Sequence, residues 1–574
     1  MNWAPRLQFL RPFAWKPLVA RNPAYLRFYK AERQQELVQA DALEYPRIRH
    51  DGTPMRIPTF RKKYGHIEPG VVVDEEVTIR GRVEFVRIAS SKLVFVVVRN
   101  EFEQVQGMLN FRALGPADKT TRSVFKKWSK LVARGDIVSV TGKATRTTSG
   151  ELTVLATRMP EILAPSLVPL PVKMEDEGAQ IQRRHMDMLV NRRTVDTLRL
   201  RSYLIKYIRD FFHERDFLEF QTPILADASG GALATPFVTS GEDLSSRGLS
   251  LRIAPELWLK RLVVGGIDRV FELGPSFRNE GIDQTHNPEF TTCEFYNAYA
   301  NLDDLLKLTE DLICGAAEHC QDLITDKLHS LPAIDLAGFR RPFKQMEFIP
   351  TLESALGFPL PDLTQNSALE DLVALLKAKS ILVTEESPSL AKLLDKLAAT
   401  YIEPHSMDEP VFITNHPVCM SPLSKSFTCP STKQMVSARA ELFIGGKEMA
   451  NMYEEENDPF AQRQKFIQQA LANDKIRSQS QQADDVYIDE SYIEALESGL
   501  PPTGGWGCGI ERLVMLFSGT PRISDTLSFG NLRNVVAVSA LRRPPLVDME
   551  GRKKPRPRPE GVGLYDDVRY GSSE

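Results

Sequence analysis

The chain has 574 residues, 26% of them charged and 42% hydrophobic, which is ordinary globular composition with room for two or three domains. Its formal net charge of -3 excludes a general attraction to nucleic acid, so any RNA contact must rest on local patches. No apolar run reaches the length of a membrane span, and the six cysteines form no C-x-x-C pair, so we expect neither a membrane segment nor a disulfide or structural zinc framework.

The N-terminus is basic and free of acidic residues until Glu32. Aromatic and apolar residues such as Trp3 and Phe9 lie between its six basic side chains. Such segments are typical of mitochondrial transit peptides, so we predict a targeting segment over residues 1–31 and a location in the mitochondrial matrix. A disordered basic arm that touches RNA phosphates is the alternative. Residues 32–69 are expected to form a helical extension.

Short strand-like segments over residues 70–165 predict a small β-barrel. They lie around Val77–Ile79 and at residues 93–98, 105–111, 136–141 and 151–157. Five short strands with glycine corners favour an OB-fold, which commonly binds oligonucleotides.

A stiff linker is predicted at residues 166–190, because prolines are frequent at its start. Apolar residues then recur at helical spacing over residues 194–213. The segment Phe217-Leu218-Glu219-Phe220-Gln221-Thr222-Pro223 follows, and we expect it to be a strand.

Two motifs more than 200 residues apart carry the chemistry. The first is Phe277-Arg278-Asn279-Glu280-Gly281, followed by His286-Asn287-Pro288-Glu289-Phe290-Thr291. The second is Gly504-Gly505-Trp506-Gly507-Cys508-Gly509-Ile510-Glu511-Arg512, and apolar residues at helical spacing come after it. Arginine suits developing charge on a phosphate, since it is always ionised and presents a planar fork of donors. Glycines let a backbone approach a ligand closely.

Together these motifs resemble motifs 2 and 3 of the class II aminoacyl-tRNA synthetases, and residues 217–223 resemble motif 1. The resemblance implies an α+β fold: an N-terminal OB-fold β-barrel plus a catalytic domain, here residues 191–541, with an antiparallel sheet flanked by helices. It also implies ATP and tRNA as substrates and a homodimer formed through motif 1.

The predicted barrel narrows the resemblance to one subgroup of these synthetases. Its segments VTIRGRVEFVRI, QVQGML and GELTVLATRM resemble the anticodon-binding barrel of the lysyl, aspartyl and asparaginyl group, class IIb. By that resemblance Phe95 would stack on an anticodon base, and Arg87, Gln106 and Glu151 would bind base edges. Phe95 could instead be a core residue, because its neighbours are all valines.

Acidic residues near the arginine motif indicate the amino acid. So many carboxylates beside an ATP site require cations, and Mg²⁺ and an ammonium-bearing substrate are the two available kinds. Aspartate would need a basic side chain opposite it. The acidic pocket therefore favours L-lysine. Residues 252–300 and 441–459 resemble lysyl-tRNA synthetases, which implies tRNA(Lys) as the second substrate.

The resemblance assigns the ATP site residue by residue. Arg278 would contact the α-phosphate and the lysine carboxylate, Glu280 the adenine amino group, and His286 the outer phosphates. Phe290 would stack on adenine, with Arg512 on the other face reaching the γ-phosphate. Arg278 and Arg512 would be the catalytic residues. The Mg²⁺ ligands would be two carboxylates, Glu441 and Glu448, of which Glu441 would also contact ATP.

The lysine site is assigned in the same way. Glu256 and the backbone at Gly231 would take the α-ammonium group, and Asn451 the carboxylate. The ε-ammonium group would be enclosed by four side chains, with Glu455 as the main charge partner: Glu294, Tyr296, Tyr453 and Glu455.

The sequence departs from the family pattern at Thr235, Trp506 and Cys508, and it continues into a basic, proline-rich tail at residues 542–574 that we expect to be disordered. Three alternatives remain. One is an aspartyl or asparaginyl synthetase, the second is an inactive RNA-binding protein derived from a synthetase, and the third is a lysyl-transferase that acts on a protein.

Overall fold

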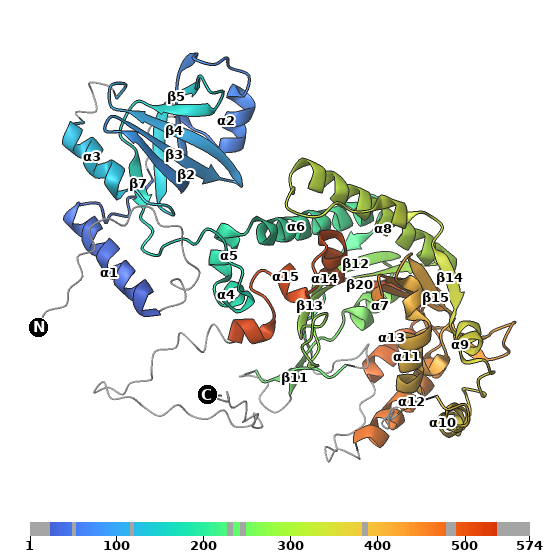
Figure 1. The fold of residues 1–574 in the computed structure, drawn as a ribbon. Helices are drawn as coiled ribbons and strands as arrows, with labels where there is room; N and C mark the ends of the chain where they lie inside the picture. The colour runs from blue at the N-terminus through green and yellow to red at the C-terminus, as the bar shows by residue number, and fades with distance from the viewer. Residues whose placement is uncertain are drawn as a thin grey trace, which may run out of the picture. The chain divides into compact units, whose positions relative to one another are not determined.

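The computed structural model describes residues 23–48, 53–114, 120–226, 234–241, 248–381, 389–477 and 489–536. They belong to two compact units, Met1–Glu175 and Asp176–Glu574. The first contains a β-barrel, and the second contains a mainly antiparallel sheet flanked by helices, so the predicted α+β fold is confirmed (Figure 1). Within the described ranges, no helix combines the length and apolarity that a membrane span requires.

The barrel is a seven-stranded sheet in the order β1-β2-β3-β4-β6-β5-β7, closed by pairing between β2 and β5. Its strands are β1 (Thr53–Pro54), β2 (Val72–Ser90), β3 (Leu93–Asn100), β4 (Glu103–Asn110), β5 (Ile137–Arg146), β6 (Leu152–Ala156) and β7 (Glu161–Ala164). The five predicted segments correspond to β2 to β6, which form the ring. Strand β2 is long enough to pair with β3 along one edge and β5 along the other.

Alternation along β3 separates the barrel core from its outer surface. Val94, Val96 and Val98 are buried in the core. Phe95 lies between them in sequence, is only partly buried, and therefore points to the outer face, because successive strand residues face opposite sides. The alternative that Phe95 is a core residue is wrong.

Three helices accompany the barrel: α1 (Pro23–Gln39), α2 (Ile57–Tyr64) and α3 (Arg122–Leu131). Arg33 of α1 forms a buried ion pair with Asp136, 3.0 Å apart, which fixes this helix against the barrel. Most of the predicted targeting segment lies outside the described residues, and its last part begins α1.

The predicted linker, residues 166–190, contains two short helices in its second half, α4 (Glu177–Gln182) and α5 (Arg184–Val190). Arg184 is 9% exposed and donates to the carbonyl oxygens of Asp525 and Leu527 in the second unit. Arg184 therefore anchors this stretch by satisfying distant backbone carbonyls, a role that the frequency of prolines does not reveal.

The second unit is built on an eight-stranded sheet in the order β14-β15-β18-β19-β20-β13-β12-β8. Its strands are β8 (Leu218–Glu219), β12 (Arg269–Phe277), β13 (Glu289–Ala298), β14 (Lys344–Glu347), β15 (Val411–Thr414), β18 (Arg439–Ile444), β19 (Lys447–Glu454) and β20 (Thr503–Gly509). The central strands are antiparallel, and the edge strands β8 and β14 join in parallel. Pairing of β13 with β20 brings the two predicted motifs together.

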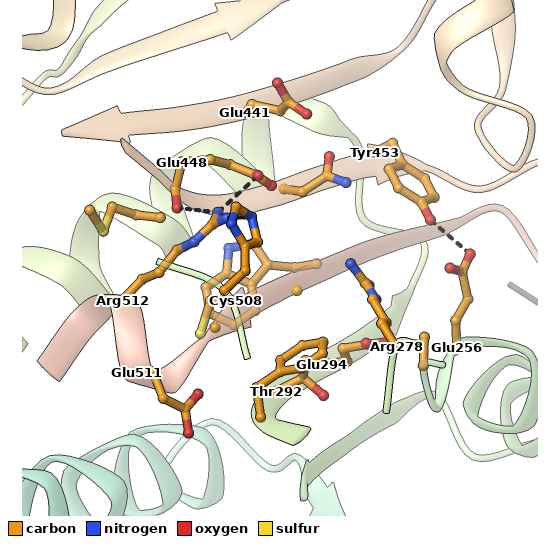
Figure 2. Close-up of a pocket in the computed structure, with 18 of the residues that line it drawn as sticks. Glu256, Arg278, Thr292, Glu294, Glu441, Glu448, Tyr453, Cys508, Glu511 and Arg512 are labelled. Atoms are coloured by element: carbon orange, nitrogen blue, oxygen red, sulfur yellow. Dashed lines mark hydrogen bonds and ion pairs between the residues drawn. The ribbon is translucent and has the colours of Figure 1, made fainter. Parts of the chain in front are cut away.

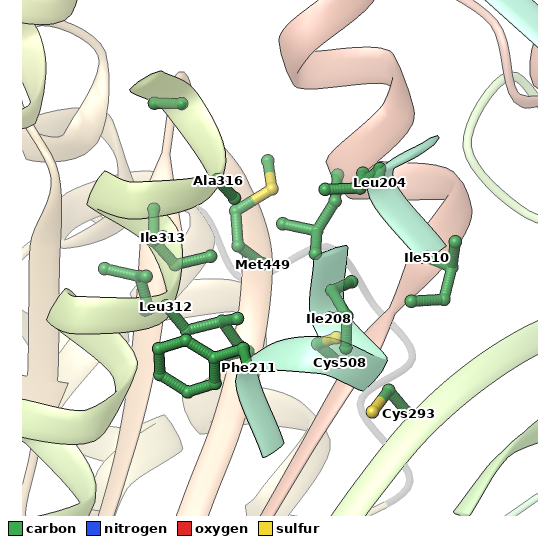
Figure 3. Packing of buried hydrophobic residues seen from close by; sticks show 14 of the residues in the cluster. Leu204, Ile208, Phe211, Cys293, Leu312, Ile313, Ala316, Met449, Cys508 and Ile510 are labelled. Carbon is green, nitrogen blue, oxygen red and sulfur yellow. The ribbon is translucent and has the colours of Figure 1, made fainter. Parts of the chain in front are cut away.

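One face of this sheet is covered by three helices: α6 (Arg192–His213), α8 (Leu302–Asp326) and α14 (Ile510–Ser518). The periodicity predicted for residues 194–213 is confirmed by α6. Figure 3 shows Ile208 of α6 beside Cys508 of β20. Leu204 of α6 and Leu312 of α8 contribute to the same cluster. The opposite face is covered in part by other helices, and it also holds the site.

The remaining helices are α7 (Glu256–Val264), α9 (Phe348–Leu356), α10 (Ala368–Ala378), α11 (Leu390–Tyr401), α12 (Pro459–Arg477), α13 (Glu490–Glu497) and α15 (Ile523–Thr526), with 3-10 turns at Leu336–Phe339, Glu403–Ser406 and Val418–Met420. Two small sheets are formed by β9 (Leu225–Ala226), β10 (Val238–Thr239) and β11 (Leu249–Leu251), and by β16 (Ser426–Thr428) and β17 (Met435–Ser437).

Candidate active site

A cavity of about 460 Å³ lies on the sheet face opposite α6 and α8. Strand alternation selects its lining: on β13, Cys293 and Phe295 enter the core, whereas Glu294 and Tyr296 line the cavity. Twelve of the predicted catalytic-domain residues contribute to its wall: Glu256, Arg278, Glu280, His286, Phe290, Glu294, Tyr296, Glu441, Glu448, Asn451, Tyr453 and Arg512.

The glycine strand β20 forms the floor of the cavity. Gly507 and Gly509 line the cavity, and a Cβ atom at Gly507 would lie 3.3 Å from Cγ of Glu294. The ring of Trp506 points into the core, where it stacks on Phe295 with centroids 5.2 Å apart. The alternation of glycine with bulky residues therefore places the large side chains away from the site, and Trp506 does not obstruct it.

Arg278 follows directly after β12 and reaches the middle of the cavity (Figure 2). Its guanidinium lies 5.2 Å from the centroid of the Phe290 ring. The loop after Arg278 is held by a hydrogen bond from the Asn279 amide to the carbonyl oxygen of Thr235, 2.7 Å long. Thr235, a departure from the family pattern, thus contributes through its backbone.

Arg512 lies at the more open end of the cavity, in the first turn of α14. It donates to the carboxylate of Glu448 at 3.0 Å and to the Glu448 carbonyl at 2.9 Å (Figure 2). Its other terminal nitrogen lies 3.3 Å from Nε2 of His286. Predicted phosphate contacts and a predicted metal ligand therefore meet at one place.

A two-glycine hairpin brings the predicted metal ligands onto adjacent strands. Gly445 and Gly446 have φ of 59° and 70°, the backbone that such a tight turn requires. Glu441 lies before the turn and Glu448 after it. Burial alone would raise the pKa of Glu441, but the neighbouring Arg439 and His416 lower it to about 2, so the side chain is a carboxylate.

These two carboxylates fit a magnesium ion that arrives with a nucleotide. Mg²⁺ is commonly held by one or two carboxylates together with substrate phosphates. Among the residues that the structure describes, no cluster of three or more acidic, histidine or cysteine side chains forms a complete metal cage. A donor set of Glu441 and Glu448 matches the shared mode of binding.

The other end of the cavity is buried and acidic. Glu256, at the start of α7, accepts a 2.7 Å hydrogen bond from the hydroxyl of Tyr453 (Figure 2). The Tyr296 hydroxyl lies 3.3 Å from Glu294. Burial, and secondly the charge of Glu256, raise the pKa of Glu294 to about 8. After its predicted ligand we name this group the ammonium pocket, and we define it by Glu256, Glu294, Tyr296 and Tyr453.

Two predicted lysine contacts are placed differently. Glu455 does not line the cavity: its side chain is fully buried and forms an ion pair with Lys260. The sequence prediction gave Glu455 an external partner because it did not anticipate this internal cation. Gly231 lies outside the described residues.

Sequence reasoning missed three residues that organise the site. Lys260 pairs with Glu256 and Glu455, Arg439 pairs with Glu441, and Glu511 accepts from the Thr291 amide and from Arg201. The first two could have been found, because Lys260 is four residues after Glu256 on a helix and Arg439 is two residues before Glu441 on a strand. The role of Glu511 depends on tertiary contacts and had no local signal.

The predicted anticodon-binding residues lie on the barrel. The guanidinium of Arg87 is 4.6 Å from the centroid of the Phe95 ring, and the two residues are paired across β2 and β3. Gln106 on β4 donates to the hydroxyl of Thr153 on β6, at 3.0 Å. Glu151 is exposed just before β6. The four residues thus belong to neighbouring strands, or to the residue just before one.

Comparison with known proteins gives the family. Residues 176–533 match the family described as tRNA synthetases class II (D, K and N), and residues 77–162 match the OB-fold nucleic acid binding domain. The chain is 40% identical to the mitochondrial lysine–tRNA ligase of Schizosaccharomyces pombe, over 88% of this chain and 93% of the relative.

Two further relatives agree. The mitochondrial lysine–tRNA ligase of Saccharomyces cerevisiae is 36% identical, over 80% of this chain and 82% of its own length. A protein named probable cytoplasmic lysine–tRNA ligase, from Encephalitozoon cuniculi, is 38% identical over 80% of this chain and 88% of its own length. The chain therefore belongs to the class II tRNA synthetases of the D, K and N group, as a member of the lysine–tRNA ligase family.

Proposed function

We propose that the protein activates L-lysine with ATP to form lysyl-adenylate and transfers the lysyl group to tRNA(Lys) for translation in the mitochondrial matrix. The observation that carries this proposal is the position of the ammonium pocket. Buried carboxylates and tyrosine hydroxyls lie next to Arg278, so an amino acid with two ammonium groups can be held there with its carboxylate facing an arginine.

The proposed reaction needs no side-chain nucleophile. The lysine carboxylate attacks the α-phosphorus of ATP, the bond to the β-phosphate oxygen breaks, and pyrophosphate leaves. Arg278 neutralises charge on the α-phosphate oxygens, and Arg512 with His286 binds the outer phosphates. The ribose hydroxyl of the terminal tRNA nucleotide then attacks the lysyl carbonyl carbon and releases AMP.

Magnesium binding would fall to Glu441 and Glu448. The ion would supply charge neutralisation for the phosphates. Glu448 is paired with Arg512 in the structure, so nucleotide binding would exchange this ion pair for contacts of both side chains with the ligand. The Nδ2 group of Asn451 would donate to the lysine carboxylate, since its Oδ1 already accepts from Arg439 at 2.9 Å.

Lys260 bears on the aspartate alternative. An aspartate pocket needs a cation that can reach the substrate side chain, and Lys260 lies within ion-pair distance of Glu256 in the ammonium pocket. Its side chain is fully buried and paired with two carboxylates. It is therefore not free to bind an acidic substrate, and the surroundings favour lysine.

The barrel is proposed to read the anticodon, with Phe95 stacking on a base and Arg87, Gln106 and Glu151 binding base edges. Base stacking on an aromatic side chain is worth about 1–3 kcal/mol. Phe95→Ala should therefore raise the KM for tRNA by roughly 5- to 150-fold and leave ATP–pyrophosphate exchange unchanged. Equal loss of both activities would contradict the assignment.

Homodimerisation is proposed through the region of motif 1. Apolar side chains are exposed there, at Leu218, Leu225 and Val238, with exposed fractions of 53%, 51% and 71%. Light scattering of the purified protein should give twice the chain mass, and Leu225→Asp should give the monomer. For the compartment, residues 1–31 fused to a fluorescent protein should direct it to mitochondria, and cytosolic fluorescence would contradict this.

The test of the proposed activity is amino-acid-dependent ATP–pyrophosphate exchange with all twenty amino acids. Exchange with L-lysine alone is the expected result. Exchange with aspartate or asparagine would overturn the assignment of lysine as the substrate. A folded, ATP-binding protein that shows exchange with no amino acid would support the inactive RNA-binding alternative.

A further inference from the structure

A lysine of the chain itself lies behind the ammonium pocket. Lys260 is on α7, one turn after Glu256, and its side chain has no exposed surface. Its Nζ atom is 2.5 Å from Oε1 of Glu256 and also forms an ion pair with Glu455. Burial alone would lower the pKa of Lys260, but the charges of Glu256 and Glu455 raise it above its ordinary value, so the group is an ammonium ion.

Aromatic rings complete the surroundings of this ammonium. Its Nζ atom lies 5.7 Å from the ring centroids of Tyr296 and Tyr453, and 5.9 Å from that of Tyr492. Tyr296 and Tyr453 line the cavity with their other surfaces. The same two tyrosines therefore separate Lys260 from the cavity and form part of the cavity wall.

Glu256 is shared between the two sides of that wall. Its Oε1 atom accepts from both Lys260 and Tyr453, and the residue also lines the cavity. A carboxylate held by two donors on one oxygen has a fixed orientation, and its second oxygen remains for a ligand. Glu455, which is fully buried beside Gly505, is held through Lys260 from behind the wall.

Charge balance suggests why a lysine pocket contains a lysine. Burial raises the pKa of both Glu294 and Glu455, so their ionised forms depend on nearby cations. When Glu256, Glu294 and Glu455 are all ionised they carry three negative charges, and Lys260 offsets one of them. The remaining two match the two ammonium groups of L-lysine. Without Lys260 the filled pocket would hold an uncompensated buried charge, which is strongly unfavourable in a low-dielectric interior.

We propose that Lys260 is a positioning residue for substrate binding: it fixes the carboxylates of Glu256 and Glu455 and sets the net charge that receives the ammonium groups of lysine. The proposal rests on lysine being the substrate. It predicts that Lys260 acts on the affinity for lysine through its two carboxylate partners and has little effect on the chemical step.

A purely structural ion pair is the competing explanation. Buried salt bridges are weak evidence for stability and can link two elements without any role in binding. A structural role would lower thermal stability when Lys260 is replaced, with no change in the KM for lysine. The two explanations therefore differ in which quantity changes.

The experiment is a double-mutant cycle in the full-length protein with Lys260→Met, Glu455→Gln and the double variant, read by lysine-dependent ATP–pyrophosphate exchange. Methionine keeps the length of the side chain and removes the charge. Lys260→Met should raise the KM for lysine about tenfold or more with kcat changed less than threefold, because only uniform binding is lost. Its effect should be several-fold smaller in the Glu455→Gln background, because the two residues act together.

The matched control is Arg184→Met, which removes a buried charge from a pair with Asp187 on α5. It should lower the melting temperature and leave the KM for lysine unchanged. The increase in melting temperature on addition of L-lysine is a second readout. This increase should be smaller for Lys260→Met than for the parent protein or the control.

Two results would overturn the role of Lys260: an unchanged KM for lysine in a folded Lys260→Met variant, or the same fold-increase in both backgrounds. If Lys260→Met does not fold, Glu455→Gln and the double variant still give the comparison. Their KM values for lysine should agree within a few-fold, and a tenfold difference would contradict the proposal. Failure of the parent protein to respond to lysine would instead overturn the proposed function.

Discussion

The two ends of the active-site cavity are built differently. At the ammonium end, the side chains of Lys260 and Glu455 are fully buried and that of Glu256 is 7% exposed, and their charges are already paired inside the protein. At the phosphate end, the side chains of Arg512, Glu448 and His286 are 24%, 37% and 53% exposed. Under the proposed function, the first end would be preorganised for lysine, whereas the second would exchange its ion pairs when a nucleotide binds.

This difference separates selectivity from catalysis. Fixed, desolvated carboxylates discriminate between ligands because an unmatched charge there is costly. Partly exposed ion pairs are weaker and can be replaced by phosphate contacts with little loss. Changes at the ammonium end should therefore alter the KM for lysine, and changes toward the phosphate end should alter the KM for ATP and the rate.

The largest effect is expected at Arg278, which lies between the two ends. Arg278→Ala should lower kcat for lysine-dependent exchange by about 10²–10³-fold, because it removes a fixed donor aimed at developing charge. Arg278→Lys should recover only part of the rate, since lysine lacks the planar fork. A loss confined to the KM for lysine would place Arg278 in ground-state binding only.

Two glycines of β20 provide a matched pair. A Cβ atom at Gly505 would lie 1.8 Å from Oε1 of Glu455 and 2.7 Å from the ring of Tyr296, whereas at Gly509 its nearest neighbour would be 4.0 Å away. Gly505→Ala should therefore reduce kcat/KM for lysine by about 100-fold, as expected for overpacking of a rigid site. Gly509→Ala should change it by only a few-fold, and equal effects would contradict the difference between the ends.

A substitution at Glu294 tests the role of negative charge at the ammonium end. Glu294→Gln should raise the KM for lysine by about tenfold or more, because it removes a buried charge partner, and should leave the KM for ATP within twofold. Glu318→Gln, an exposed carboxylate on α8, is the control and should change neither constant. A matching rise in the KM for ATP would mean that Glu294 acts on both ends.

The pH dependence of lysine binding tests the same carboxyl group. The pKa of Glu294 in the empty site is about 8, so below that pH the carboxyl carries a proton that it must lose to face an ammonium group. The KM for lysine should therefore fall as pH rises from 6 to 8, by at most about tenfold per unit, and level off above 8. In Glu294→Gln this dependence should disappear; a flat profile in the parent would contradict the assignment.

The sequence was sufficient for the parts of the site that follow strand and motif patterns. Arg278, Glu294 and Tyr296 are placed by β12 and β13, and the alternation in β20 explains why Trp506 does not enter the cavity. The barrel and its strands were likewise predicted from short segments with the pattern of strands.

What the sequence did not reveal depends on contacts between distant segments. The pairing of Lys260 with Glu455 joins residues almost 200 positions apart, and no local pattern indicates that a carboxylate predicted to meet the substrate already has a partner in the chain. The linker helices were missed for a similar reason. Arg184 is a charged residue, and yet it is buried against carbonyl groups of a distant segment.

Calorimetric titration of the ATP-free protein with L-lysine and with norleucine, its isostere without the ε-ammonium group, would test the preorganised ammonium end most directly. L-lysine should bind without ATP, and norleucine should bind at least 100-fold more weakly, since it leaves a buried carboxylate unmatched. Equal affinity for the two ligands, or lysine binding that appears only after ATP is added, would contradict a closed end that is ready before the nucleotide arrives.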